Sequence, residues 1–177
     1  MNPPPGQQLN QQIYQWFRMA DQSQNGQLDF HELNRALRND AVTNFRPETC
    51  RMMISMFDAE GDGKINPYEF EKLWNYLAQW RQTFNQFDKD RSGAIDRAEL
   101  AQALQTMGYR LSDSFVTIAL SKFDPDRTGN LRFDDFIRLC CILNSLTMQF
   151  AQNDPQRQGR ITVAYEQFLT MIFTSAV

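Results

Sequence analysis

One short pattern occurs five times in this chain, and this repetition constrains the fold more than any other feature. Each copy is an acid-rich stretch with a glycine, followed two residues later by Leu or Ile. The glycines are Gly26, Gly63, Gly93, Gly129 and Gly159, and the aliphatic residues are Leu28, Ile65, Ile95, Leu131 and Ile161. The intervals between the glycines are 37, 30, 36 and 30 residues. Such regular intervals indicate one supersecondary unit used five times.

The segments between the copies predict about eight helices, two of them shared by neighbouring repeats. Residues 70–87 contain no Gly or Pro, and their apolar residues lie three and four apart, as on one face of a helix. Residues 136–153 also contain no Gly or Pro and predict a second helix of the same kind. The longer intervals contain breaks instead, at 39–47 and at Met107-Gly108 before Ser112, a residue that caps helices well. The expected fold is therefore all-α.

The repeated stretches match the twelve-residue EF-hand loop. Calcium takes six to eight oxygen ligands, which this loop supplies from positions 1, 3, 5, 7, 9 and 12, with Gly at position 6 for the turn. We expect loops one to five at 21–32, 58–69, 88–99, 124–135 and 154–165, in one domain over 10–177 that follows a short Pro- and Gly-containing tail, 1–9. Of the 21 acidic residues, 16 lie in these loops, as expected for dedicated cation sites.

The first three loops carry complete ligand sets and predict three calcium sites. Loop one offers Asp21, Ser23, Asn25, the carbonyl of Gln27, Asp29 and Glu32. Loop two offers Asp58, Glu60, Asp62, the carbonyl of Lys64, Asn66 and Glu69. Loop three, which fits best, offers Asp88, Asp90, Ser92, the carbonyl of Ala94, Asp96 and Glu99. Glu60 is one methylene longer than the usual Asp at position 3.

Loops four and five depart from the consensus. Loop four offers Asp124, Asp126, Thr128 and the carbonyl of Asn130, but Arg132 stands at position 9 and Asp135 replaces the Glu of position 12. A shorter Asp tends to give one oxygen, which favours Mg²⁺ or no ion over calcium. Loop five has Asp154, Gln156, Gln158 and, at position 12, Tyr165, which indicates a structural role.

On these motifs the chain resembles the penta-EF-hand family from about residue 10 to its end. The complete first loop places it with the peflin and apoptosis-linked-gene-two branch. ETCRMMISMFD (48–58) resembles the former, whereas GYRLSDSF (108–115), FDDFI (133–137) and YEQFLTMIF (165–173) resemble the latter. The resemblance implies a cytosolic calcium sensor and adaptor that dimerises through its fifth EF-hand. It also implies calcium-dependent binding of Pro-rich target segments and peripheral association with membranes.

Pairing of the loops predicts where a second chain binds. The aliphatic residues at position 8 of two loops join in a short ladder, so loop one can pair with loop two and loop three with loop four. Ile161 of loop five is left without a partner, and the apolar segments 139–143 and 168–173 are too apolar for a free surface. The predicted dimer interface contains Ile161, Phe168, Leu169, Ile172 and Phe173. A homodimer and a heterodimer with another penta-EF-hand protein both remain open.

Aromatic and basic residues on the third repeat are candidates for a target groove. Trp74 and Trp80 lie on the first shared helix, and Arg110 follows the break after loop three. Trp74, at the edge of the apolar stripe, is the better groove candidate, whereas Trp80 is assigned to the core. Met52, Met53 and Met56 could form an adaptable binding surface, although packing in the core is the favoured interpretation.

Other function classes find little support. The single histidine, His31, occupies position 11 of loop one, and no phosphate-binding glycine loop is present, so an enzyme is not expected. The basic residues are dispersed, which disfavours nucleic-acid binding. No signal peptide or membrane span is expected, and the odd number of cysteines indicates free thiols in the cytosol. Two alternatives remain: a non-catalytic regulatory subunit like the calpain small subunit, and a passive calcium buffer.

Overall fold

The structure, a computed structural model, describes residues 9–38 and 45–175 as an all-α fold, as predicted. These residues form eight helices: α1 (Gln11–Ala20), α2 (Phe30–Arg38), α3 (Pro47–Phe57), α4 (Pro67–Phe87), α5 (Arg97–Thr106), α6 (Asp113–Phe123), α7 (Phe133–Asn153) and α8 (Tyr165–Ser175). None of these helices is long and apolar enough to cross a membrane. The predicted break at Met107-Gly108 and the Ser112 cap of α6 are confirmed, while most of the break at 39–47 lies outside the described residues.

Both shared helices exist, and each begins three residues earlier than the apolar pattern indicated. In α4 the N-cap Asn66 accepts from the backbone N–H of Glu69, and the Glu69 carboxylate accepts from that of Asn66. This reciprocal cap satisfies amides that the first turn leaves unpaired, and Pro67 suits the first helical position. The last residues of a loop are therefore the first turn of its exit helix, so position 12 moves with that helix.

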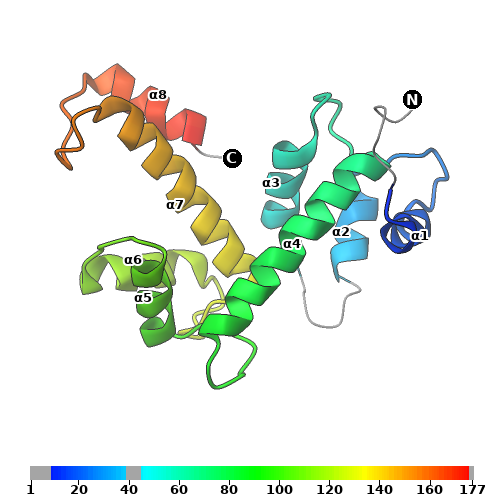
Figure 1. Ribbon diagram of the computed structural model, residues 1–177, viewed down its shortest axis with the longest axis horizontal. Helices are drawn as coiled ribbons and strands as arrows, with labels where there is room; N and C mark the ends of the chain where they lie inside the picture. Colours follow the sequence, from blue (N-terminus) through cyan, green and yellow to red (C-terminus); the bar gives the residue numbers. More distant parts are fainter. Residues whose placement is uncertain (1–8, 39–44, 176–177) are drawn as a thin grey trace.

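The long helix α4 runs through the middle of the molecule (Figure 1). Helices α1, α2 and α3 surround its N-terminal half, and α5 and α6 lie beyond its C-terminal end. Helix α7 starts against α3, α4 and α6 and then projects away from them, carrying α8 at its far end. Among the described helices, α8 contacts only α7.

Phenylalanines of α4 and α7 form the centre of the core. Phe70 and Phe84 on α4 and Phe136 on α7 are each at most 1% exposed. Phe70 meets Phe17 of α1 edge-on at 5.7 Å, and Phe84 meets Phe136 at the same centroid distance. Burying one such side chain contributes roughly 1.5–3 kcal/mol. The same helix thus anchors both halves of the molecule.

The predicted pairing of the loops is confirmed. Leu28 and Ile65 exchange two backbone hydrogen bonds, of 2.8 and 2.9 Å, and Ile95 and Leu131 exchange two of 2.7 and 2.8 Å. All four side chains are fully buried. These two are the isolated β-bridges of the described part of the chain, and Ile161 belongs to neither of them.

The expectation that the apolar segment 139–143 is part of an exposed patch at the dimer interface was wrong. Leu139, Cys140 and Leu143 are buried, and Cys141 and Ile142 are partly buried. The first half of α7 packs against α3, α4 and α6 together, so its neighbours cover it on several sides. Of the apolar segments predicted for the dimer interface, only that of α8 remains substantially exposed.

The three cysteines are free thiols, as predicted. Burial raises the pKa of Cys50 to about 12 and raises the pKa of Cys140 as well, so both thiols stay protonated near neutral pH. Of the three clustered methionines, Met52 and Met53 are buried, which confirms the core interpretation for them. Met56 is 40% exposed.

Candidate calcium centres and an adjoining apolar cavity

All five loops share the same internal turn. The Asp at position 1 accepts a hydrogen bond from the backbone N–H of the Gly at position 6, at 2.9, 2.7, 3.0, 2.6 and 2.7 Å in loops one to five. These glycines have φ between +72° and +81°, a backbone region that side chains disfavour. The turn therefore forms in every loop, whether or not the remaining ligands suit a metal.

The Glu at position 12 closes loops one, two and three in the same way. In loop three Glu99 accepts from the backbone N–H of Lys89 at 2.9 Å and from that of Asp96 at 3.1 Å. Glu69 binds the equivalent amides of loop two, those of Ala59 and Asn66, while Glu32 binds the amides of Ser23, one position later than in the other loops, and Asp29. All three carboxylates are at least 91% buried. The exit helix thereby presents a fixed carboxylate to the inside of each loop.

Carboxylates converge in loops two and three. Oxygens of the acids at positions 1, 3 and 12 lie within 4.8 Å of one another in both loops: Asp58, Glu60 and Glu69 in loop two, and Asp88, Asp90 and Glu99 in loop three. Three negative charges at this distance repel one another, and an all-oxygen set of this kind suits a hard cation such as calcium. The residues present therefore fit the ion that these loops imply.

Hydrogen bonds from the loops favour the charged form of these acids. The backbone N–H of Gly63 lowers the pKa of Asp58, and hydrogen bonds from Ser92 lower that of Asp90. The long side chain of Glu60 stays within its loop, where it accepts from the side-chain amide of Asn66 at 3.1 Å. Its extra methylene thus does not keep its carboxylate away from those of Asp58 and Glu69.

Loop one is tied to loop two by side chains as well as by the backbone bridge. Asp21 accepts from the backbone N–H of Asn25 at 3.1 Å, and Gln27 donates its side-chain amide to Asp62 at 2.8 Å. Asp62 is the position-5 residue of loop two. A change in one loop of the pair can therefore act directly on the other.

Loop four does not fit a divalent cation in its present arrangement. Its acids at positions 3 and 12, Asp126 and Asp135, form ion pairs with Arg132 of the same loop and with Arg46, the N-cap of α3. Burial, with repulsion from Asp134, raises the pKa of Asp135 to about 6 despite these arginines. Sequence reasoning missed Arg46 because it lies far from loop four in the chain.

Loop five has no carboxylate at the closing position. Tyr165 is 76% exposed, and Glu166, one place later, is exposed too. Gln156 and Gln158, at positions 3 and 5, hydrogen-bond to each other at 2.6 Å. With Asp154 as its one acid, the donor set is that of a structural loop.

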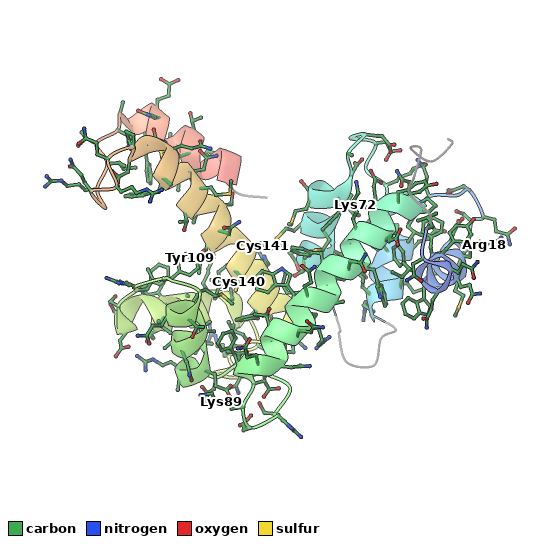
Figure 2. The ribbon with its side chains drawn as sticks, in the orientation of Figure 1. Arg18, Lys72, Lys89, Tyr109, Cys140 and Cys141 are labelled. Carbon is green, nitrogen blue, oxygen red and sulfur yellow. The ribbon has the colours of Figure 1, made fainter. Side chains whose placement is uncertain are left out.

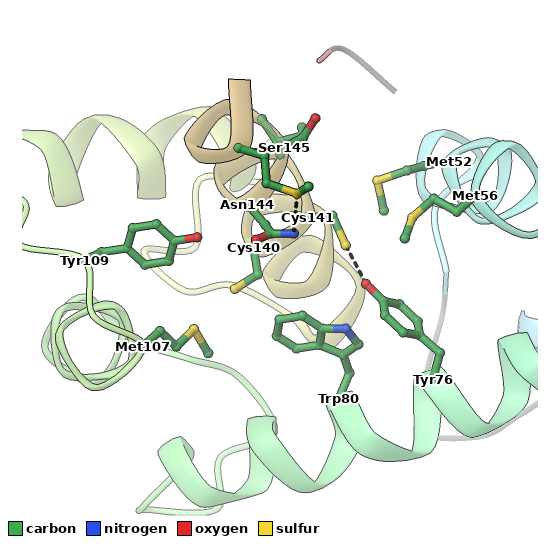
Figure 3. A pocket seen from close by; sticks show the side chains of 12 residues that line it. Met52, Met56, Tyr76, Trp80, Met107, Tyr109, Cys140, Cys141, Asn144 and Ser145 are labelled. Atoms are coloured by element: carbon green, nitrogen blue, oxygen red, sulfur yellow. Dashed lines mark hydrogen bonds between the residues drawn. The ribbon is translucent and has the colours of Figure 1, made fainter. Parts of the chain in front are cut away.

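An apolar cavity of about 470 Å³ opens between α3, α4 and α7 (Figure 3). Four of its lining residues carry thioether groups and two carry thiols. The lining consists of Met52, Met56, Tyr76, Trp80, Met107, Tyr109, Cys140, Cys141, Ile142, Asn144, Ser145 and Met148. Across it, the Tyr76 hydroxyl and the Cys141 thiol are hydrogen-bonded at 2.9 Å. Flexible, polarisable methionines let such a surface adapt to different apolar ligands.

The three residues predicted for a target groove do not lie together. Trp80, which was assigned to the core, lines this cavity. Trp74, preferred for the groove, packs against Trp16 of α1 at a centroid distance of 4.6 Å. Arg110 lines a separate hollow beside α5 and α6. Position relative to the apolar stripe did not indicate which tryptophan lines the cavity, because α4 is covered by different helices along its length.

Helix α8 lies at the projecting end of the molecule (Figures 1 and 2). Four of the residues predicted for the dimer interface belong to this helix, and Ile161 lies in the loop before it. Phe168 is 49% exposed, Ile172 41% and Phe173 76%, while Ile161 and Leu169 are partly buried. Together with Tyr165, the exposed members give α8 a largely apolar outer face.

Comparisons with known proteins agree with this geometry. The family described as EF-hand domain pair matches residues 10–74 and 77–141. Peflin of Danio rerio is 41% identical over 174 residues, which cover 98% of this chain and 64% of that protein. Mouse sorcin is 38% identical over 174 residues, covering 96% of this chain and 86% of sorcin. The chain spans 58–64% of the length of the peflins it matches.

A solved structure shares the fold. It is described as a homolog of programmed cell death 6 protein from Leishmania major Friedlin, with a TM-score of 0.80 and 29% sequence identity. The match covers 93% of this chain and 94% of that one. Fold, loop geometry and sequence similarity thus point to the same group of proteins.

Proposed function

Because this chain belongs to the penta-EF-hand family of calcium-binding proteins, we propose that it is a calcium sensor and adaptor in the cytoplasm. Calcium at loops one, two and three would open the apolar cavity to a segment of a target protein. The proposed ligands are the oxygens of those three loops, closed by Glu32, Glu69 and Glu99. The proposed target is a Pro-rich segment, whose extended conformation suits a cavity with flat aromatic walls.

One observation carries this proposal: helix α4 joins two carboxylate clusters to the cavity. Loop two precedes its first residue, loop three follows its last, and Tyr76 and Trp80 between them line the cavity. The exit helix of loop three, α5, holds Glu99 in its first turn, and Met107 and Tyr109 at its far end line the cavity too. A reorientation of α5 on calcium binding therefore changes the width of the cavity.

The rim of the cavity offers a direct test. Met148 is 57% exposed and lines the cavity, so Met148→Asp should leave the core intact but place a charge at the mouth. We expect calcium-dependent binding of a fluorescent proline-rich peptide to weaken about tenfold or more, because burying an apolar side chain is worth about 1.5–3 kcal/mol. Fluorescence anisotropy measures this affinity with calcium and with chelator.

Met19→Asp is the matched control, because Met19 is 76% exposed on α1 and does not line this cavity. It should bind the peptide as the wild type does. Equal weakening by both substitutions would contradict the assignment of the cavity. A hydrophobic dye titrated alongside distinguishes a sensor from a passive buffer, since a buffer opens little and its dye fluorescence would not rise with calcium.

Calcium should also promote attachment to anionic membranes. Three ions add six positive charges, which changes the formal charge from −3 to +3. Basic surfaces are attracted to anionic lipids, and the attraction weakens with salt. We expect more protein to sediment with phosphatidylserine vesicles in calcium than in chelator, and less at high salt. Equal sedimentation in calcium and in chelator would contradict this prediction.

A further inference from the structure

An arginine from the other half of the molecule lies in loop four, at the acids that would otherwise face a metal. The guanidinium of Arg46 forms an ion pair with Asp126, and its Nε lies 3.2 Å from Oδ1 of Asp135. The backbone N–H of Arg46 donates to Asp134 at 2.9 Å. Arg46 thus binds three acids of loop four, although it precedes them by 80 to 89 residues.

A second guanidinium completes the arrangement. Arg132, at position 9 of the loop, lies 3.2 Å from Asp126 and 3.8 Å from Asp135. These two acids occupy positions 3 and 12 of loop four. In loops two and three, the acids at positions 3 and 12 form the carboxylate cluster together with the acid at position 1. In loop four the same positions bind two cationic side chains. Planar guanidinium groups match carboxylates well through paired N–H donors.

The surroundings hold Arg46 in place. The side chain of Asp135 is only 4% exposed and that of Arg46 22% exposed. The preceding residue, Phe45, is buried and meets Phe133 of α7 edge-on at 6.0 Å. Arg81 of α4 lies over the same ring, 3.6 Å from its centroid. The start of α3 is therefore fixed to the start of α7 by an apolar contact and by charge.

We propose that loop four is a guanidinium-binding site in which Arg46 takes the place of a metal ion. In this role Arg46 joins the half that contains loops one and two to the half that contains loops three and four, without calcium. Its charge excludes divalent cations from loop four, since the carboxylates of Asp126, which is half exposed, and Asp135, which is buried, are already matched by two arginines. The inference does not depend on the adaptor function, because it concerns a loop outside the three proposed calcium sites.

The first test asks whether Arg46 itself excludes the metal. Arg132→Asn with Asp135→Glu gives loop four a consensus ligand set, and this double variant is compared with the triple variant that also carries Arg46→Gln. We expect calorimetric titration with calcium alone to show one more calcium site in the triple variant than in the double variant. If the double variant binds calcium at loop four at all, its affinity there should be at least about tenfold lower than that of the triple variant. Equal stoichiometry and affinity in the two variants would overturn the proposal.

The second test asks whether Arg46 joins the two halves, using Arg46→Gln in the otherwise unchanged chain with chelator present. Amide hydrogen exchange in the first turns of α3 and α7 should become at least about tenfold faster, because both turns lose the contact that fixes them. Arg18→Gln removes the same charge from an exposed position on α1 and should leave that exchange unchanged. Wild-type exchange in Arg46→Gln, or an equal effect of Arg18→Gln, would contradict the coupling.

Discussion

Glu99→Gln is expected to weaken calcium binding at loop three at least about 100-fold, because it removes one negative charge and one of the two carboxylate oxygens that close the site. The substitution keeps the volume of the side chain, and Gln can still serve in the N-terminal cap of α5. The helix should therefore persist while the site is lost. Calorimetric titration should show one fewer tight site than in the wild type.

The matched control for this prediction is Glu48→Gln. Glu48 is an exposed acid in the first turn of α3, outside every loop, so it changes the net charge equally without touching a ligand set. Its titration should match that of the wild type. If Glu99→Gln kept the wild-type stoichiometry and affinity, the placement of the calcium site in loop three would be wrong. Loss of the dye response in Glu99→Gln alone would further link loop three to the cavity.

Phe168→Asp is expected to convert a dimer into a monomer. Tyr165, Phe168 and Ile172 are spaced by three and four residues and so lie on one face of α8, and each is at least 41% exposed. Helix α8 contacts only α7 among the described helices, and Ile161 lies outside the loop bridges. We propose that this face binds the same face of a second copy across a two-fold axis.

Two copies of the substitution would then meet at the interface, and we expect the dimer to weaken at least about 30-fold, as for a central apolar contact. Light scattering at micromolar concentration should give about twice 20.7 kDa for the wild type and 20.7 kDa for the variant. Ile118→Asp, on an exposed residue of α6, should stay dimeric. A monomeric wild type would contradict the homodimer, and a complex formed only after adding another penta-EF-hand protein would support a heterodimer instead.

The local features of this fold were predictable because short segments of sequence determine them. The turn of each loop needs one Asp and a Gly five residues later, and the caps of the exit helices α2, α4 and α5 need residues three apart. The shared helices follow from uninterrupted apolar spacing between two loops. Even the loop pairs could be predicted, since Leu28, Ile65, Ile95 and Leu131 stand at equivalent positions of neighbouring repeats.

The features that join distant parts of the chain could not be predicted in this way. Nothing near Arg46 in the sequence indicates that its charge lies in loop four, because that contact depends on how α3 meets α7. Trp80 rather than Trp74 lines the cavity because different helices cover α4 at different heights. The apolar residues of 139–143 are equally apolar whether they face solvent or three other helices. The sequence by itself determined the loops, the helices and the oxygen-bearing residues at the ligand positions of the loops, through local geometry. Only the tertiary structure decided which charges pair and which apolar faces stay exposed, because burial depends on the packing of the whole chain.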